Sequence, residues 1–216
     1  MRRVSPTRLF RSFRLSRRPQ RFLIVFAHPH PDSFSAALCR TAHEALLAAG
    51  HHVDVINLYA DDFDPRLTAA ERSVYETPTP IISEQIERYA DLVRRATGIV
   101  FVYPTWWWGL PAILKGWLDR VLVPGVSFVL DPQTNKVTPG LGHVRHVIGI
   151  STYGSSRLTM RFFNDAGRRN IMRCIRMLAP PLSCRGLWMG LYKLDASTPA
   201  RRQEFLADVR ATLEKL

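Results

Sequence analysis

The chain has 216 residues, of which 46% are hydrophobic and 22% are charged, so one globular domain with a sizeable core is expected. No apolar run approaches the ~18–20 residues that a membrane-spanning helix needs. The three cysteines, Cys39, Cys174 and Cys184, show no CxxC spacing. This argues against a disulfide framework or a zinc site and favours a reducing compartment, with the cytoplasm as the expected location.

The formal net charge of +12 is concentrated at the start of the chain. Residues 1–20 contain seven arginines and no acidic residue, and the remaining 23 basic and 18 acidic residues leave a net charge of +5. That modest positive excess suits a site that receives phosphates. The sequence contains no recognition-helix signature and no run of interleaved basic and aromatic residues, so nucleic-acid binding is not expected. Residues 1–20 fit a disordered extension, an organellar targeting segment or translation from an upstream start codon. We expect a disordered or spurious extension before a folded domain at 21–216.

The first elements predict a βαβ unit. Residues 22–27 form a short apolar run without alternation, as in a central parallel strand. A loop at 28–35 leads to a helix predicted over 36–49, which Gly50 ends, and a second strand is predicted at 53–58.

The loop at 28–35 has features of an anion site. Ser33 or Ser35 can cap the following helix and leave backbone N–H groups free at its N-terminus, and His28 could add a donor. The loop lacks the motifs GxGxxG and GxxxxGK[ST]. Taken alone, it favours the simpler alternative of an ordinary capped helix with a surface histidine.

A long connection at 59–80 precedes an amphipathic helix predicted over 82–96. The connection contains Asp61, Asp62 and Asp64, which lack the glycine and the terminal glutamate of a calcium loop. A solvated turn is therefore expected there, and no metal site is predicted.

Three adjacent tryptophans, Trp106, Trp107 and Trp108, follow a buried strand at 98–102 and precede a helix at 111–122. Neighbouring side chains on a loop diverge, so at least one indole should face a cleft, where a flat aromatic ligand could lie against it. The alternative is that the indoles cap the core or fill a dimer interface.

The rest of the chain continues the alternation of strands and helices. The sequence predicts a projecting loop or small hairpin at 123–142, a fourth strand at 144–151 and a loop of small hydroxyl residues at 151–156. A helix at 160–178, a fifth strand at 182–189 and a last helix at 198–213 are predicted after them. Five strands alternating with five helices predict an α/β fold, a flavodoxin-like three-layer sandwich. Its five-stranded parallel sheet should have the order 2-1-3-4-5, with helices on both faces.

Ligands bind at the carboxyl ends of the strands in such a sheet. Three loops, 28–35, 104–109 and 151–156, should converge there and offer hydroxyls, an anion-binding helix start, aromatic rings and backbone groups. A planar cofactor with a phosphate tail fits all three loops better than the alternatives do.

These residues carry a resemblance. From Arg21 to Leu216 the chain resembles the flavodoxin-like NAD(P)H:quinone oxidoreductase family, which includes mammalian quinone reductases, bacterial modulator-of-drug-activity proteins and ancillary subunits of potassium-efflux systems. The most specific parts are Ala27-His28-Pro29 with Ser33-Phe34-Ser35, and Tyr103-Pro104 to Pro111 running into Ile113-Leu114-Lys115-Gly116-Trp117.

The resemblance implies roles by position. It assigns the phosphates of a flavin to His28, Ser33, Phe34 and Ser35. It assigns the isoalloxazine edge to Pro104, Thr105, Trp106, Trp107 and Trp108, and the other side of the ring to Ser151, Thr152, Tyr153 and Gly154. It also implies that Trp108 and Phe128 wall the pocket where nicotinamide and quinone alternate, and that Phe128 could come from the partner subunit of a homodimer.

One departure from the family concerns catalysis. The mammalian enzymes place a Tyr–His pair after the third loop, where this chain has Arg157-Leu158-Thr159-Met160. Tyr153 or Arg157 could instead stabilise an anionic flavin, and Tyr153 is the candidate catalytic residue.

The resemblance implies a flavin-dependent NAD(P)H oxidoreductase that reduces quinones by ping-pong hydride transfer. FAD is the expected cofactor, with FMN as the alternative, and NADH or NADPH is the donor. Rival functions are an azo- or nitro-compound reductase, a flavin-binding regulatory subunit of a membrane transporter, and an electron carrier of the flavodoxin type. The basic charge and the aromatic-walled pocket argue against the carrier.

Overall fold

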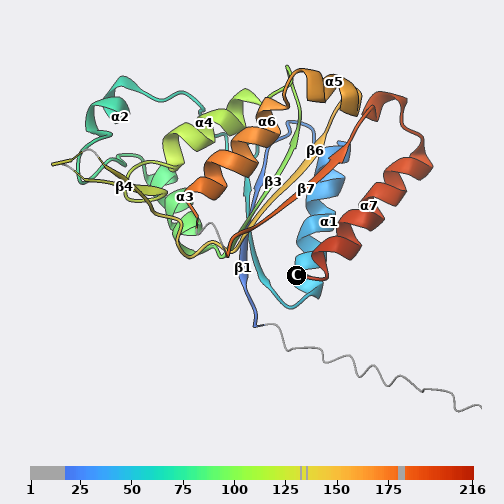
Figure 1. Ribbon diagram of the computed structural model, residues 1–216, viewed down its shortest axis with the longest axis horizontal. Coiled ribbons are helices and arrows are strands. Elements are labelled where there is room, and N and C mark those ends of the chain that lie inside the picture. The colour runs from blue at the N-terminus through green and yellow to red at the C-terminus, as the bar shows by residue number, and fades with distance from the viewer. Residues whose placement is uncertain (1–17, 132, 135, 180–182) are drawn as a thin grey trace, which may run out of the picture.

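The computed structural model describes residues 18–131, 133–134, 136–179 and 183–216 (Figure 1). The expected disorder of residues 1–20 concerns mainly residues 1–17, which lie outside the described residues. The first strand begins at Arg21, as the sequence predicts.

Five parallel strands form the central sheet in the order β2-β1-β3-β6-β7. They are β1 (Arg21–Phe26), β2 (His52–Asn57), β3 (Gly98–Pro104), β6 (His146–Thr152) and β7 (Arg185–Leu191). Every residue of β3 and β6 is buried, because helices cover both faces of the sheet and leave no solvent side on which polar residues would alternate. The predicted strand order, 2-1-3-4-5 when only these strands are counted, is confirmed.

Helices form the two outer layers of the sandwich (Figure 1). One core joins the sheet to α1 (Phe34–Ala48) and α7 (Pro199–Leu213), which pack against each other. A second core lies on the opposite face, under α3 (Glu84–Arg95), α4 (Ala112–Val121) and the helical segments after β6. The predicted three-layer architecture is therefore confirmed.

The connection between β2 and α3 holds a helix that we did not predict. α2 (Ala69–Val74) begins with a capping box, in which the Thr68 side chain accepts from the Glu71 N–H and the Glu71 carboxylate accepts from the Thr68 N–H. The other carboxylate oxygen of Glu71 accepts from Arg120 of α4, at 3.0 Å from Nε and 2.6 Å from Nη2. Both side chains are buried, so this ion pair fastens the long connection to the sandwich.

The segment 123–142 projects as the predicted small hairpin (Figure 1), made of β4 (Phe128–Leu130) and β5 (Val137–Pro139). Among the described residues, no helix is both long and apolar enough to cross a membrane.

The prediction of one helix over 160–178 is wrong. The chain forms α5 (Arg157–Phe162), α6 (Ala166–Arg169) and a π-helix, η1 (Asn170–Ile175). The break occurs at Asn164 and Asp165, whose φ angles of +66° and +42° are left-handed and cannot continue an α-helix. A short 3₁₀ turn, η2 (Leu194–Ala196), precedes α7.

Candidate functional site

The three tryptophans lie on a tight turn after β3. Trp106 and Gly109 exchange both backbone hydrogen bonds, at 3.3 and 2.9 Å, so Trp107 and Trp108 are the central residues of a two-residue turn. Their φ angles of +47° and +54° make it a type I′ turn, which usually takes Asn-Gly. Two bulky side chains in left-handed backbone store strain, and such strain is typical of functional sites.

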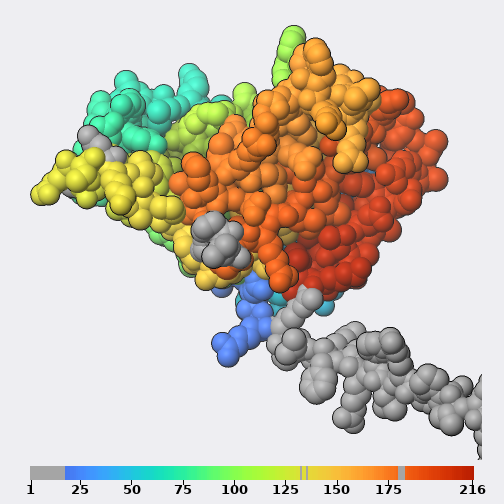
Figure 2. Space-filling model, in the orientation of Figure 1, coloured from blue at the N-terminus to red at the C-terminus, as the bar shows by residue number. Residues whose placement is uncertain are grey.

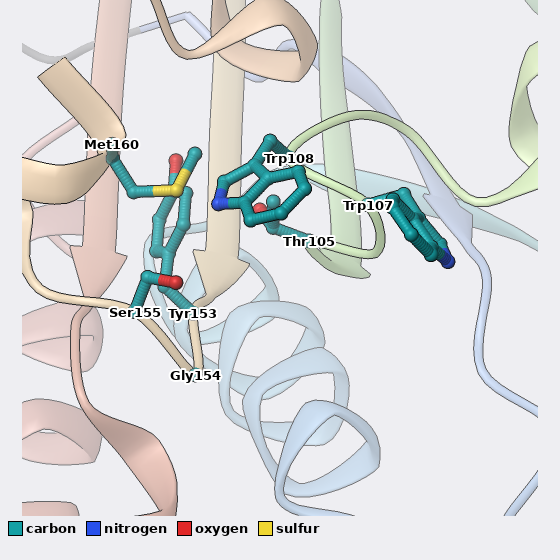
Figure 3. A pocket seen from close by; sticks show the side chains of 7 residues that line it. All are labelled: Thr105, Trp107, Trp108, Tyr153, Gly154, Ser155 and Met160. Carbon is teal, nitrogen blue, oxygen red and sulfur yellow. The ribbon is translucent and has the colours of Figure 1, made fainter. Parts of the chain in front are cut away.

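The indoles point in different directions, as expected for neighbours on a loop. Trp108 stacks on Phe163, with ring centroids 4.3 Å apart and planes inclined by 24°. Trp106 approaches the His28 ring, with centroids 6.1 Å apart. Trp107 is 91% exposed and stands apart from the other labelled side chains in Figure 3.

A cavity of about 280 Å³ opens beside this turn (Figure 3). Its wall comes from the turn, from the loop after β6 and from α5, through Thr105, Trp107, Trp108, Tyr153, Gly154, Ser155 and Met160. The second and third predicted loops therefore meet at one cavity, at the carboxyl ends of neighbouring strands, and three of its seven lining residues are aromatic.

Hydrogen bonds fix the two loops against each other. The Thr105 N–H donates to the Thr152 carbonyl at 2.7 Å, and the hydroxyls of Thr105 and Ser151 lie 2.9 Å apart. Pro104 is paired with Thr152 in the β3–β6 register and is buried, as are Ser151 and Thr152. Pro104, Ser151 and Thr152 do not line the cavity, and they hold Thr105, which does.

Tyr153 is held by two contacts at the cavity wall. Its hydroxyl donates to the Asp165 carboxylate at 3.2–3.3 Å, and its ring stacks on Tyr192 with centroids 4.4 Å apart. Burial, reinforced by the neighbouring Asp165, raises the pKa of Tyr153 well above its ordinary value. Burial also raises the pKa of Asp165. Tyr153 therefore stays protonated at neutral pH and is a donor, not a base.

The first predicted loop forms a capped helix start. Ser33 accepts from the Ala36 N–H at 3.1 Å. The N–H groups of Phe34 and Ser35, in the first turn of α1, have no acceptor in the described part of the chain. Nδ1 of His28 accepts from the His30 N–H at 3.0 Å, and partial burial lowers the pKa of His28. The ring is therefore neutral near pH 7 and carries its proton on Nε2, where it can donate.

One predicted site residue stays untested in the single chain, and one residue at the site was not predicted. Phe128 lies on the β4–β5 hairpin and does not line the cavity of its own chain, so its role from a partner subunit stays a prediction. Asp165 was not singled out, because it fell inside the predicted long helix. Asn-Asp is a pair that tolerates left-handed backbone, and this was the available signal for the break.

A family model described as having a flavodoxin-like fold matches residues 20–175. A ribosyldihydronicotinamide dehydrogenase-like protein, traD of Penicillium crustosum, is 39% identical over 134 residues, which cover 53% of this chain and 48% of that protein. The ribosyldihydronicotinamide dehydrogenase (quinone) of Mus musculus is 35% identical over 124 residues, which cover 50% of this chain and 54% of the mouse enzyme.

The chain thus spans about half the length of the curated relatives that it matches. Among solved structures, Smu.1420 from Streptococcus mutans UA159 superposes with a TM-score of 0.76 at 27% identity, covering 91% of this chain and all of that one.

Proposed function

Because the chain belongs to the family with the flavodoxin-like fold, we propose that it is a flavin-dependent NAD(P)H oxidoreductase that reduces quinones by two electrons. In this reaction NAD(P)H and a proton convert a quinone to a hydroquinone and release NAD(P)⁺. Residues 21–216 form the flavin-binding domain. The names of two relatives, a ribosyldihydronicotinamide dehydrogenase (quinone) and an NAD(P)H dehydrogenase (quinone) 1, support this reaction class.

One observation carries the proposal. The strained Trp107–Trp108 turn presents backbone N–H groups with no acceptor in the described part of the chain, beside an aromatic cavity at the strand ends. A fold has no structural need for two tryptophans in a type I′ turn, so a ligand is the natural reason for them. The acceptor atoms along the edge of an isoalloxazine ring match such N–H donors.

The donor set also fits the phosphates of a flavin. Phe34 and Ser35 offer backbone N–H groups without an acceptor among the described residues at the positive end of α1, and neutral His28, on the same loop, offers Nε2–H. The contact between His28 and Trp106 brings this loop against the turn, so one cofactor could reach both. FAD is the proposed cofactor and FMN the alternative.

When bound, the flavin supplies the hydride-accepting and hydride-donating chemistry, and the protein binds, orients and shields. The free N–H groups of Trp107 and Trp108 would stabilise negative charge on the ring edge. Trp108 would provide a flat wall on which nicotinamide and quinone stack in turn, which gives ping-pong order. Tyr153, protonated and anchored on Asp165, would hold a proton near the ring without acting as a base.

We further propose a homodimer in which Phe128 of one chain faces the site of the other. Val129 and Val137, on the projecting hairpin that carries Phe128, are 55% and 53% exposed, as residues that await a protein partner would be. Size-exclusion chromatography with light scattering would give twice the chain mass. A strictly monomeric protein that still turns over would refute the shared site.

Steady-state kinetics with NADH or NADPH and a soluble benzoquinone test the function. We expect one quinone reduced per donor oxidised and parallel lines in double-reciprocal plots. Trp108→Ala should raise the quinone KM by roughly 10-fold through the lost stacking surface, whereas Trp108→Phe should keep most of it. A flavin-loaded protein that oxidises neither donor would refute the proposal.

A further inference from the structure

A second cavity, of about 510 Å³, lies beside the first, between α5, α6, η1 and the residue after β7. We call it the arginine groove, because six arginines line it: Arg157, Arg161, Arg168, Arg169, Arg173 and Arg176. The segment that carries them, in orange, faces the viewer in Figure 2.

Most of these charges have no ion-pair partner among the described residues. In the described part of the chain, none of the six guanidinium groups lies within salt-bridge distance of a carboxylate, whereas eight other basic side chains do. Asp165, a carboxylate in the groove wall, accepts the Tyr153 hydroxyl and also attracts Arg168, so it offsets at most one of the six positive charges. Arg157 and Arg161 are also four residues apart on α5, a spacing at which like charges repel. An anionic ligand would remove this repulsion.

The arginine groove and the aromatic cavity are adjacent. Met160 lines both of them. Tyr153, in the wall of the cavity, stacks on Tyr192, in the wall of the groove, with their planes inclined by 12°. One extended ligand could therefore place a flat ring against Trp108 and an anionic tail among the arginines.

We propose that the arginine groove binds the 2′-phosphate of NADPH and makes NADPH the preferred donor. The inference rests on the proposed function, in which nicotinamide occupies the aromatic cavity. NADPH differs from NADH only by this phosphate, and planar guanidinium groups bind phosphate through paired, charge-assisted hydrogen bonds. The groove is a hollow next to the cavity proposed for nicotinamide and shares Met160 with it, which favours a dinucleotide over an anionic membrane surface as its occupant.

Calorimetry with adenosine 2′,5′-bisphosphate and with ADP tests the groove without turnover. The variant is Arg161→Ala/Arg173→Ala, because both side chains are exposed and make no hydrogen bond or ion pair within the described residues. The control is Arg88→Ala/Arg95→Ala on α3, which removes the same charge outside the groove. We expect the bisphosphate to bind roughly 10-fold tighter than ADP, and the groove variant to lose roughly 10- to 100-fold in bisphosphate affinity, while the control keeps it.

The donor preference gives a second readout. The ratio of kcat/KM for NADPH to that for NADH should fall roughly 10-fold in the groove variant, through the KM for NADPH, with NADH kinetics unchanged. Equal affinities for the two nucleotides, or equal losses in the groove and control variants, would overturn the inference. If the groove variant lost binding to phosphatidylglycerol vesicles but kept the wild-type affinity for the bisphosphate, the inference would also be overturned, in favour of a membrane surface.

These outcomes separate the groove from the proposed function. Arginine-dependent bisphosphate binding by a protein that fails to reduce quinones would support the groove and refute the reductase. Quinone reduction with equal use of NADH and NADPH in both variants would refute the groove and leave the reductase standing.

Discussion

Trp107 offers a direct test of strain at the site. Its side chain is 91% exposed and therefore contributes little to stability, whereas its φ of +47° is a left-handed backbone conformation that lowers stability. A left-handed conformation costs about 1–2 kcal/mol for an ordinary L-residue, and asparagine tolerates it better than alanine does. Trp107→Asn and Trp107→Ala both delete the indole and its edge contact with Trp108, so the difference between them isolates the backbone.

We expect Trp107→Asn to be more stable than Trp107→Ala by about 0.5–1 kcal/mol, or about 1–4 °C in Tm for a chain of this size. Calorimetric and urea unfolding measure this difference. Both variants should show the same rise in quinone KM, because both lose the indole at the cavity mouth. Equal unfolding free energies would refute the strained turn, and a wild-type KM in both variants would refute a role for the indole.

Three further predictions concern side chains that hold the site's scaffold. Arg120→Met should lower the unfolding free energy by about 3–5 kcal/mol, since it leaves the Glu71 carboxylate buried without its cation; a loss below about 1 kcal/mol in urea unfolding would contradict this. Burial raises the pKa of Glu71, but hydrogen bonds from Arg120 and Thr68 outweigh it and leave that pKa below its ordinary value. The stabilisation by the Glu71 carboxylate is therefore present above the unfolded pKa of about 4.3 and is lost as pH falls through the lower folded pKa. The difference in unfolding free energy between wild type and Glu71→Gln should shrink from pH 7 to pH 3. A difference that stays constant with pH would exclude this coupling between Glu71 protonation and stability. Ser33→Ala removes the cap of α1 and should cost about 1 kcal/mol in thermal unfolding and weaken flavin retention; unchanged values of both would argue against the phosphate cradle.

The strand order could be predicted because each strand is a short, largely apolar run and each crossover between strands contains helix. The site loops could be placed for the same reason, since the carboxyl ends of parallel strands share one edge. Trp108 and Tyr153, which come from loops after different strands, were expected at one crevice and line one cavity.

The turn type, the helix break and the buried ion pair could not be predicted from the sequence. The type I′ turn requires positive φ angles at both central residues, and a Trp-Trp pair does not predict them. The break at Asn164–Asp165 disrupts an apolar periodicity that continues into η1, so the pattern predicted one helix. The pairing of Glu71 with Arg120 joins residues 49 apart, and no local pattern encodes it.

The most direct test of the account is the absorbance spectrum of the purified protein, followed by anaerobic addition of NADPH and then of a soluble benzoquinone. We predict the bands of an oxidised flavin, which bleach with NADPH and return with the quinone; heat release of the pigment would then identify FAD or FMN. A colourless protein that takes up neither FAD nor FMN would contradict the cofactor assignment and leave the tryptophan turn as a protein interface.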